Sequence, residues 1–285
     1  MKIVSFSLEK GNQYFGEIDG TRFFIGKRVS YGDNKGLMNI TGDPGQQYDR
    51  DVFRPTFGFW ADFIHPTAMC EGALYHTLNT YDRARFTFSF LQFAAHVPNG
   101  DFVQYLRELL TLTSAADYFP DLTLQKDRIA LITDTGNIDL ESDGSTEGLM
   151  KYFNPSSDSI EVTEVIQAAR LIHWVQNDPL HQQKQIEVGI SLFKNKMVQY
   201  DRRYGLNGVD DDLCLVIADI RHQGRGSSAE ILTALRSSKP LENLLEIGKD
   251  EYPHRIAVLS HEIKVLKTAG QLGTHKYDTA KKDFV

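Results

Sequence analysis

Two kinds of hydrophobic pattern meet near residue 80. Residues 66–79 contain good helix formers, Pro66 stands where a first helical turn would begin, and Glu71 lies among apolar neighbours. Beyond residue 80, every second residue from 86 to 90 is a phenylalanine, which is the periodicity of a β-strand. The pattern therefore predicts a helix that carries Glu71 and runs into a β-hairpin, with Asp82 at the mouth of the hairpin.

Residues 1–50 carry strand signals that are broken by turns. Asp19-Gly20 lies between two apolar runs and predicts a tight β-hairpin. The stretches Asp33-Asn34-Lys35-Gly36 and Gly42-Asp43-Pro44-Gly45 predict loops. We therefore expect residues 1–50 to form a β-rich segment or flap, and residues 51–285 to form the main domain.

The rest of the chain has a mostly helical pattern. Asp101 is the predicted N-cap of a helix over residues 102–110, and a short strand pair is expected near residues 128–140. The tail after Gly270 is polar, and we expect it to be loose. Further helices are expected within 161–205, 210–224, 227–236, 240–247 and 250–268. Together these elements predict an α+β protein that is mainly α.

Composition and charge exclude several classes of protein. The chain has 285 residues, of which 41% are hydrophobic and 24% charged, as is ordinary for a folded protein with a core. The net charge of −7 gives no indication of nucleic-acid binding. No apolar run is long enough for a membrane span, and no signal peptide is evident. We expect the protein to be made in the cytoplasm, with no nucleic-acid partner and no membrane span.

The two cysteines, Cys70 and Cys214, are far apart in the sequence, and each has apolar, helical surroundings. We expect two buried free thiols, and a disulfide is the alternative if the two helices touch. The chain has no Cys-x-x-Cys or His-x-x-x-His pair, so we expect no metal site and no cofactor.

Glu71, Asp82 and Thr87 form the candidate catalytic set. Apolar neighbours disfavour the charged form of Glu71, which suits a general acid. Asp82 is the candidate base that activates water, and the hydroxyl of Thr87 is a candidate for orienting that water. Glycosidic hydrolysis needs such a pair, because one carboxyl protonates the leaving oxygen while another stays ionised. Each residue also has an ordinary interpretation, as a solvated helix residue, a turn aspartate and a strand threonine.

The order of residue types around Glu71, Asp82 and Thr87 gives a second reason to group them. Residues 71–82 read Glu-Gly-x-x-Tyr-x-x-x-Asn-x-x-Asp, and residues 86–93 read Phe-Thr-Phe-Ser-x-x-Gln-Phe. This order resembles the active-site helix and hairpin of the lysozyme-like superfamily, which includes phage-type lysozymes, family-46 chitosanases and related phage and secretion-system muramidases. The resemblance implies that Glu71 is the general acid, Asp82 the base and Thr87 the water-positioning residue.

Four residues of the same stretch are expected to bind substrate. Gln92 matches a cleft-lining glutamine of the resembled families, Asn79 belongs to the motif, and Tyr75 and Tyr81 lie near the two acids in the sequence. Three other aromatic residues are expected in the core rather than on a sugar ring: Trp60, Phe90 and Trp174.

The chain departs from the resembled pattern at two points. Ser89 stands where relatives usually have glycine, and residues 82–85 lack the glycines of the chitosanase motif. A second likeness lies in residues 203–224, where an apolar helix carries Asp219 and His222 and ends at a glycine. These two side chains would share one helix face, and the resemblance implies a mainly structural role for them. The likeness covers roughly residues 55–265. Residues 1–50 have no counterpart in the resembled families.

The implied fold is lysozyme-like, with a catalytic helix, a hairpin and a β-rich N-terminal segment. The implied activity is cleavage of the β-1,4 glycan of peptidoglycan with inversion, for which the two carboxyls are expected about 6.5–9.5 Å apart. If Asp82 is not the base, Glu108 and Asp101 are the alternatives. A chitosanase, or a non-catalytic glycan-binding protein such as a phage baseplate or tail component, stays open.

Because no signal peptide is evident, we expect the protein to need another route from the cytoplasm to its substrate. A cell-wall hydrolase stored in the cytoplasm needs a holin, a phage particle or a contact-dependent secretion machine to reach the periplasm or the wall. We expect an antibacterial effector domain, with an immunity protein that plugs the cleft as its partner.

Overall fold

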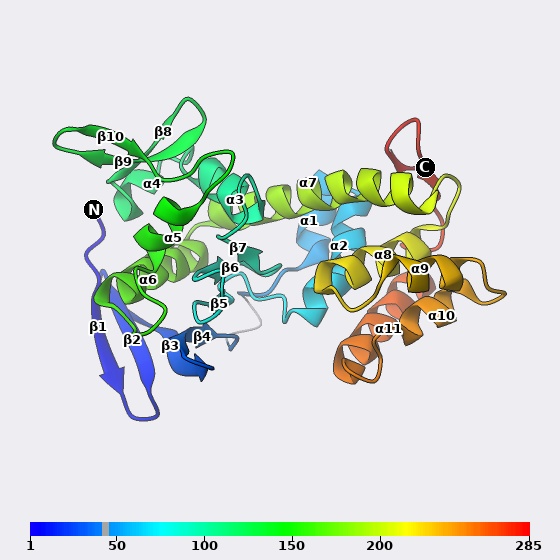
Figure 1. The fold of residues 1–285 in the computed structure, drawn as a ribbon, viewed down its shortest axis with the longest axis horizontal. Coiled ribbons are helices and arrows are strands. Elements are labelled where there is room, and N and C mark those ends of the chain that lie inside the picture. The colour runs from blue at the N-terminus through cyan, green and yellow to red at the C-terminus, as the bar shows by residue number, and fades with distance from the viewer. Residues whose placement is uncertain (42–45) are drawn as a thin grey trace. The chain divides into compact units, whose positions relative to one another are not determined.

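A computed structural model describes residues 1–41 and 46–285, so the predicted loop Gly42-Asp43-Pro44-Gly45 lies outside the described residues. The described residues are 45% helical and 20% strand, which confirms the expected mixture of helices and strands. They form two compact units, which are described separately (Figure 1). The first comprises Met1–Gln47 and Gly72–Val188, and the second comprises Tyr48–Glu71 and Gly189–Val285.

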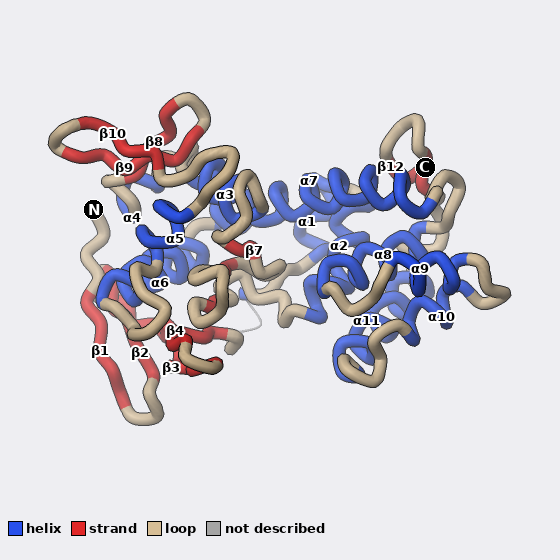
Figure 2. The backbone as a smooth tube through the Cα atoms, in the orientation of Figure 1, coloured by secondary structure: helices blue, strands red, loops and turns tan. Residues whose placement is uncertain are grey.

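The first unit holds most of the strands (Figure 2). Its strands are β1 (Ser5–Glu9), β2 (Gln13–Ile18), β3 (Thr21–Tyr31), β4 (Asn34–Asn39), β5 (Leu78–Asn79), β6 (Thr87–Phe88), β7 (Phe93–Ala94), β8 (Leu122–Gln125), β9 (Arg128–Thr133) and β10 (Gly136–Asp139). Its helices are α3 (Asp101–Leu109), α4 (Ala115–Tyr118), α5 (Glu147–Phe153), α6 (Val162–Asn177) and the N-terminal part of α7 (Pro179–Tyr204).

An antiparallel sheet organises the first unit. Strands β1 to β7 follow one another in chain order within the sheet, so each strand pairs with the next along the chain. Helix α6 packs against β2 and β3, whose apolar residues Tyr14, Ile18 and Ile25 are buried. Strands β8, β9 and β10 form a separate small sheet, which includes the predicted strand pair near residues 128–140.

The predicted N-terminal hairpin is confirmed. Asp19 and Gly20 join β2 to β3, and both have positive φ angles, of 53° and 77°, as in a type I′ turn. The loop predicted over residues 33–36 is wrong in its bounds, because Asn34 already begins β4. Gly36 serves a close approach rather than a turn, since a Cβ atom there would lie 2.5 Å from the hydroxyl oxygen of Thr80.

The compact units divide the chain differently from the boundary predicted after residue 50. Strand β4 pairs with β5 through Met38↔Asn79 and Asn39↔Leu78. This pairing joins the N-terminal strands to the hairpin region, so residues 1–47 belong to the same compact unit as residues 72–188. The N-terminal segment is therefore one side of a larger sheet.

The second unit is mainly helical (Figure 2). It contains α1 (Arg50–Phe57), α2 (Phe59–Cys70), the C-terminal part of α7, α8 (Asp211–Gln223), α9 (Ser228–Leu235), α10 (Pro240–Glu246), α11 (Pro253–Thr268), β11 (Tyr277–Asp278) and β12 (Asp283–Phe284). Helices α7 to α11 agree with the helices predicted in the second half of the chain. Helix α2 packs against both α1 and α11.

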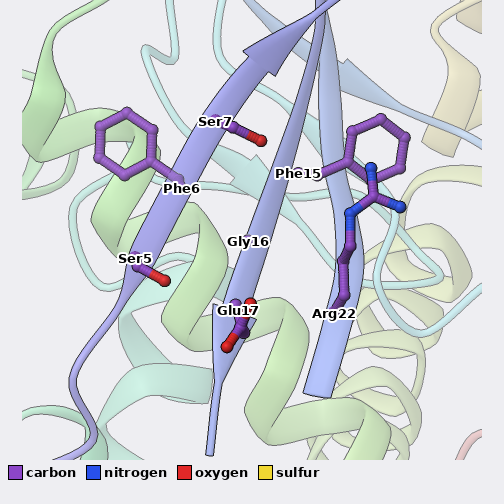
Figure 3. Close-up of a pocket in the computed structure, with 7 residues that line it drawn as sticks. All are labelled: Ser5, Phe6, Ser7, Phe15, Gly16, Glu17 and Arg22. Carbon is purple, nitrogen blue, oxygen red and sulfur yellow. The ribbon is translucent and has the colours of Figure 1, made fainter. Parts of the chain in front are cut away.

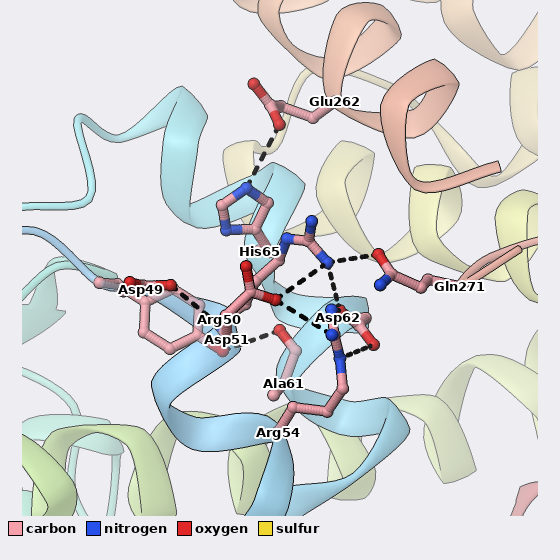
Figure 4. Close-up of polar contacts among 10 residues, drawn as sticks. Asp49, Arg50, Asp51, Arg54, Ala61, Asp62, His65, Glu262 and Gln271 are labelled. Carbon is pink, nitrogen blue, oxygen red and sulfur yellow. Dashed lines mark hydrogen bonds and ion pairs between the residues drawn. The ribbon is translucent and has the colours of Figure 1, made fainter. Parts of the chain in front are cut away.

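A buried aspartate fastens α1 to α2 (Figure 4). Asp62 on α2 is 4% exposed and accepts hydrogen bonds from Arg50 (2.8 Å) and from Arg54 (2.7 and 3.0 Å) on α1. Two charged donors on one buried carboxylate offset the cost of removing it from water. His65 of α2 contacts Glu262 of α11 at 3.2 Å, so the same helix is also tied to α11.

Two predictions about the central stretch are wrong. The helix spans Phe59–Cys70, so Pro66 lies inside it rather than at its first turn, and Glu71 is its C-cap rather than an interior residue. The strand predicted over residues 86–91 is limited to Thr87–Phe88. All six residues from 86 to 91 are buried, so the alternation of types does not separate a core face from a solvent face.

The tail after Gly270 is ordered by long-range contacts, so the expectation of a loose tail is wrong. The ring of Phe284 lies 5.0 Å from Phe63 and 5.5 Å from Trp60, measured between ring centroids. The buried carboxylate of Asp211 accepts hydrogen bonds from the backbone amides of Gly273 and His275. These partners are more than sixty residues away in the sequence, which is why local polarity gave no sign of them.

A buried glutamate in the first unit makes stability depend on pH. Glu164 of α6 is fully buried and hydrogen-bonded to Thr80, and burial raises its pKa to about 7 against the opposing effect of the Thr80 hydroxyl. A pKa raised by folding means that stability is present below the unfolded pKa and is lost as pH rises through the folded value.

We expect Glu164→Gln to remove this loss, because a glutamine cannot ionise. Between about pH 5 and pH 9 the wild type should lose roughly 3 kcal/mol of unfolding free energy that the variant keeps. Urea denaturation at both pH values measures the difference, with the exposed Glu251→Gln as control. Equal pH dependence in wild type and Glu164→Gln would contradict the assignment.

Candidate functional site

Glu71 closes helix α2 and enters a network of buried charges in the second unit. Its backbone amide donates to the carbonyl of Ala68, which ends the helix. Its carboxylate Oε1 accepts a hydrogen bond from Nη1 of Arg255 at 2.6 Å, and its side chain is only 10% exposed. The acid predicted to be catalytic is therefore held by a guanidinium from α11.

Arg255 is shared between two carboxylates. Its Nη2 and Nε donate to Asp219 at 2.7 and 3.3 Å, and Nη2 of Arg225 donates to Asp219 at 3.1 Å. Burial acts to raise the pKa of Asp219, but the two guanidiniums outweigh it and hold that pKa below its usual value. Two carboxylates and two guanidiniums balance in formal charge, which makes their burial tolerable.

His222 lies next to this network as a neutral ring. Its Nε2 is 3.8 Å from Oε1 of Glu71, and its ring centroid lies 5.8 Å from that of Phe193. Burial lowers the pKa of His222 to about 3, so the pair with Glu71 is not ionic at neutral pH. Asp219 therefore binds the arginine that holds Glu71, and His222 lies beside Glu71 as a neutral ring. Both contacts suit the structural role expected for these two residues.

Asp82 lies in a tight turn of the first unit, between β5 and β6. Its Oδ1 accepts from the amide of Ala84 at 2.8 Å, and its Oδ2 accepts from the side-chain amide of Asn79 at 3.1 Å. The carbonyl oxygen of Asn79's side chain accepts from the amide of Tyr81, so the two side chains brace the turn together. Asp82 is partly exposed, and a carboxylate can accept more than these two hydrogen bonds.

The other predicted residues of the first unit differ in their burial. Thr87 is buried in β6, directly opposite Asn79 of β5. Tyr75 is 2% exposed and its ring packs against Phe90, so it contributes to the core of the first unit. Tyr81 and Gln92 are partly exposed.

Ser89 has a backbone conformation that is unusual for a residue other than glycine. Its φ angle is 100°, in the region that favours glycine, and it is fully buried. The strain is accommodated by local hydrogen bonds: the amide of Gln92 donates to its carbonyl at 2.9 Å, and its hydroxyl accepts from the amide of Leu91 at 3.2 Å. A serine therefore occupies a glycine-type turn after β6.

The predicted catalytic residues belong to different compact units. Glu71 is the last residue of its segment in the second unit, whereas Asp82, Thr87 and the predicted substrate-binding residues belong to the first. The alternative bases also belong to the first unit. Glu108 is paired with Lys184 at 2.8 Å, and Asp101 begins α3 and accepts from the amide of Ala94 at 3.0 Å.

Sequence reasoning missed the arginines. Arg255 lies 184 positions from Glu71, and neither it nor Arg225 belongs to a recognisable local motif. Among the aromatic residues expected in the core, Phe90 and Trp174 are fully buried and Trp60 is 5% exposed. The indole of Trp60 donates to Asp283 at 2.8 Å.

A shallow hollow lies on the sheet of the first unit, outside the predicted set (Figure 3). Its volume is about 170 Å³, and β1, β2 and β3 supply Ser5, Ser7, Phe15, Glu17 and Arg22. The guanidinium carbon of Arg22 lies over the ring of Phe15, 3.9 Å from its centroid. Hydroxyls, a carboxylate and an aromatic ring are thus gathered in one open depression, too small for a drug-sized ligand.

Both cysteines are free thiols, as expected, and no disulfide joins them. Cys70 ends α2, where burial raises its pKa to about 12, and Cys214 is buried on α8. A thiol with a raised pKa is a poor nucleophile at neutral pH. Neither cysteine is therefore a candidate for covalent catalysis.

Comparisons of the chain with family models, with curated proteins and with solved structures found no match. Within residues 1–41 and 46–285, no helix is long and apolar enough to cross a membrane. The same residues contain no group of three or more His, Cys, Asp or Glu side chains arranged to hold a metal ion.

The charge network predicts a large effect of one substitution. Arg255→Met removes the donor shared by Glu71 and Asp219, and a buried pair broken on one side typically loses roughly 3–5 kcal/mol of unfolding free energy. Urea denaturation at neutral pH measures this loss. Lys239→Met is the matched control, because it removes an exposed pair with Glu242 and should change stability little. Equal effects of both substitutions would show that the network does not support the fold.

Proposed function

We propose that the protein is a glycoside hydrolase of the lysozyme-like type, which cleaves the β-1,4 glycan of peptidoglycan. Glu71 donates a proton to the leaving glycosidic oxygen, Asp82 activates a water molecule with the help of Thr87, and the reaction inverts the anomeric centre. One observation carries the proposal. A helix ends at an acid, Glu71, and the chain then enters a short antiparallel hairpin whose turn presents a second acid, Asp82.

Ser89 gives further support. The resembled families usually have glycine at this position, and the φ angle of 100° is one that glycine adopts readily. The backbone thus keeps a glycine-type turn even though the residue has changed. A serine in a glycine-type conformation at this position is therefore compatible with the resembled pattern.

The partners of the two acids fit different tasks. Glu71 is largely buried, and a bound glycan would exclude the remaining water from its carboxyl, so that a proton donated there would pass to the glycosidic oxygen and not to solvent. Arg255 orients the carboxyl through one hydrogen bond, while its other donors are engaged by Asp219. Asp82 is partly exposed and retains capacity to accept a hydrogen bond from water.

Replacing the acid tests the proposal directly. Glu71→Gln keeps the size of the side chain and its oxygen acceptor for Arg255 but cannot donate a carboxylic proton. We expect loss of cell-wall lysis by at least about a hundredfold, with an unchanged circular dichroism spectrum. Asp82→Asn should also lose most activity, and Glu251→Gln, a change of an exposed carboxylate with no proposed role, is the control. Full lysis by Glu71→Gln would overturn the assignment, and full lysis by Asp82→Asn would move the base to another residue.

The reaction products identify the substrate. Mass spectrometry of muropeptides released from purified sacculi identifies the bond that is cut, and the same enzyme incubated with chitosan tests the chitosanase alternative. A cationic chitosan chain would bind best in an acidic cleft. The net charge of −7 does not distinguish the two substrates.

The biological setting follows from the proposed substrate. A peptidoglycan hydrolase acts in the periplasm or on the wall, and we infer that a secretion system, a phage particle or lysis delivers this protein there. We infer an antibacterial effector or phage lytic role, and an immunity protein that covers the cleft is the partner that such an effector would need.

The hollow of Figure 3 favours a second candidate function, glycan binding without cleavage. An aromatic ring beside hydroxyl and carboxylate groups can contact both the apolar and the polar edges of a sugar ring. We expect Ser7→Tyr, which fills the hollow, to bind insoluble peptidoglycan several-fold more weakly than wild type in co-sedimentation. Asn137→Tyr, an exposed change on β10, should bind normally. Strong binding without sugar release, lost in Ser7→Tyr, would replace the hydrolase proposal.

A further inference from the structure

Three elements of the first unit converge on the short turn that carries Asp82. The turn runs from Thr80 at its start to Arg85 at its end. Asn154, which follows α5, is fully buried, and its side-chain amide donates to the backbone carbonyls of both Thr80 and Arg85 at 3.0 Å each. One side chain therefore ties together the two ends of the turn.

The start of the turn is held from a second direction. The hydroxyl of Thr80 accepts a hydrogen bond from the amide of Leu37 in β4 at 2.6 Å and is also bonded to the carboxyl of Glu164 in α6. Gly36 lies against the same peptide, since a Cβ atom on it would be 2.7 Å from the amide nitrogen of Tyr81. Thr80 is thus held by β4 through its hydroxyl and its backbone, and by α6 through its hydroxyl.

The inner part of the turn is held by Asp82 itself. Its Oδ1 accepts from the amide of Ala84, and its backbone carbonyl accepts from the amide of Arg85 at 3.0 Å. These local bonds set the direction of the carboxylate relative to the turn, while Asn154 and Glu164 set the turn relative to the sheet and helices. Aspartate turns of this local kind also occur unsupported on surfaces.

We propose that Asn154 and Glu164 are positioning residues, which hold the Asp82 carboxylate in place for its reaction. The proposal rests on the function proposed above, in which Asp82 activates water. It adds two residues that act through the turn itself: Asn154 through the backbone carbonyls of Thr80 and Arg85, and Glu164 through the hydroxyl of Thr80. A base that must hold a water molecule in one geometry reacts faster when its position is fixed in advance. Less conformational entropy is then lost when substrate binds.

The experiment removes the bridge and follows both order and rate. In Asn154→Ala, the backbone carbonyls of Thr80 and Arg85 lose their donor, and the amides of Ala84 and Arg85 should exchange with deuterium on the order of tenfold faster. The kcat for release of glycan fragments should fall by a similar factor, while KM stays close to the wild-type value.

Asn39→Ala is the matched control. Asn39 is also buried in the first unit, and its side-chain amide donates to two backbone carbonyls, those of Phe24 and Ile25. Its loss removes the same kind of hydrogen bonds without touching the turn. We expect Asn39→Ala to lose stability without faster exchange at Ala84 and without loss of kcat.

The outcomes separate this inference from the proposed function. Faster exchange in Asn154→Ala with an unchanged kcat would overturn the positioning role, and so would a fall in kcat with no change in exchange. A wild-type protein that releases no fragments from sacculi or chitosan would overturn the proposed function. Exchange at Ala84 would then still decide whether Asn154 holds the turn.

A wild-type measurement covers the case in which Asn154→Ala does not fold. The amide of Ala280 donates to the carboxylate of Asp278 at 2.9 Å in an exposed turn of the second unit, with the same local bond as in the Asp82 turn. We expect Ala84 to exchange at least about tenfold more slowly than Ala280. Equal exchange would mean that the Asp82 turn gains nothing from its buried supports, and would overturn the proposal.

Discussion

The buried charges around Arg255 are the constraint on which the second unit depends. A guanidinium taken out of water is tolerated only where carboxylates meet it, and Arg255 meets two of them. Because one carboxylate comes from the end of α2 and the other from α8, the arginine on α11 fixes three helices with a single side chain. The aspartate that holds α1 to α2 follows the same logic, since Asp62 is buried only in company with two arginines.

In the first unit the corresponding constraint is backbone pairing. Strands β1 to β7 pair in chain order, and this order carries the N-terminal segment directly into the hairpin region. The pairing of β4 with β5 sets where residue 80 lies, and Gly36 allows the close approach because it has no side chain. The position of the Asp82 turn is thus a consequence of sheet register together with two buried polar side chains, Asn154 and Glu164.

Local signals in the sequence were sufficient where the structure is decided locally. The turn at Asp19-Gly20 and the end of α8 at Gly224 both depend on residues that tolerate positive φ, and both were predicted. The length of α2 and the order of the tail depend on distant partners and were not predicted. Phe284 is ordered by aromatic rings from α2, more than two hundred residues earlier, and no periodicity in the tail could reveal that contact. The arginine beside Glu71 was missed for the same reason.

The two carboxylates that share Arg255 are not equivalent, because they differ in burial and in the number of charged donors that bind them. Arg255 directs two of its nitrogen donors to Asp219 and one to Glu71, and Arg225 adds a further donor to Asp219. Asp219 is also fully buried, whereas the side chain of Glu71 keeps some exposure. A group held by several charged donors and closed off from solvent neither gains nor loses a proton readily. Asp219 is therefore suited to anchoring the arginines, whereas Glu71 is the carboxylate of the pair that stays in contact with solvent.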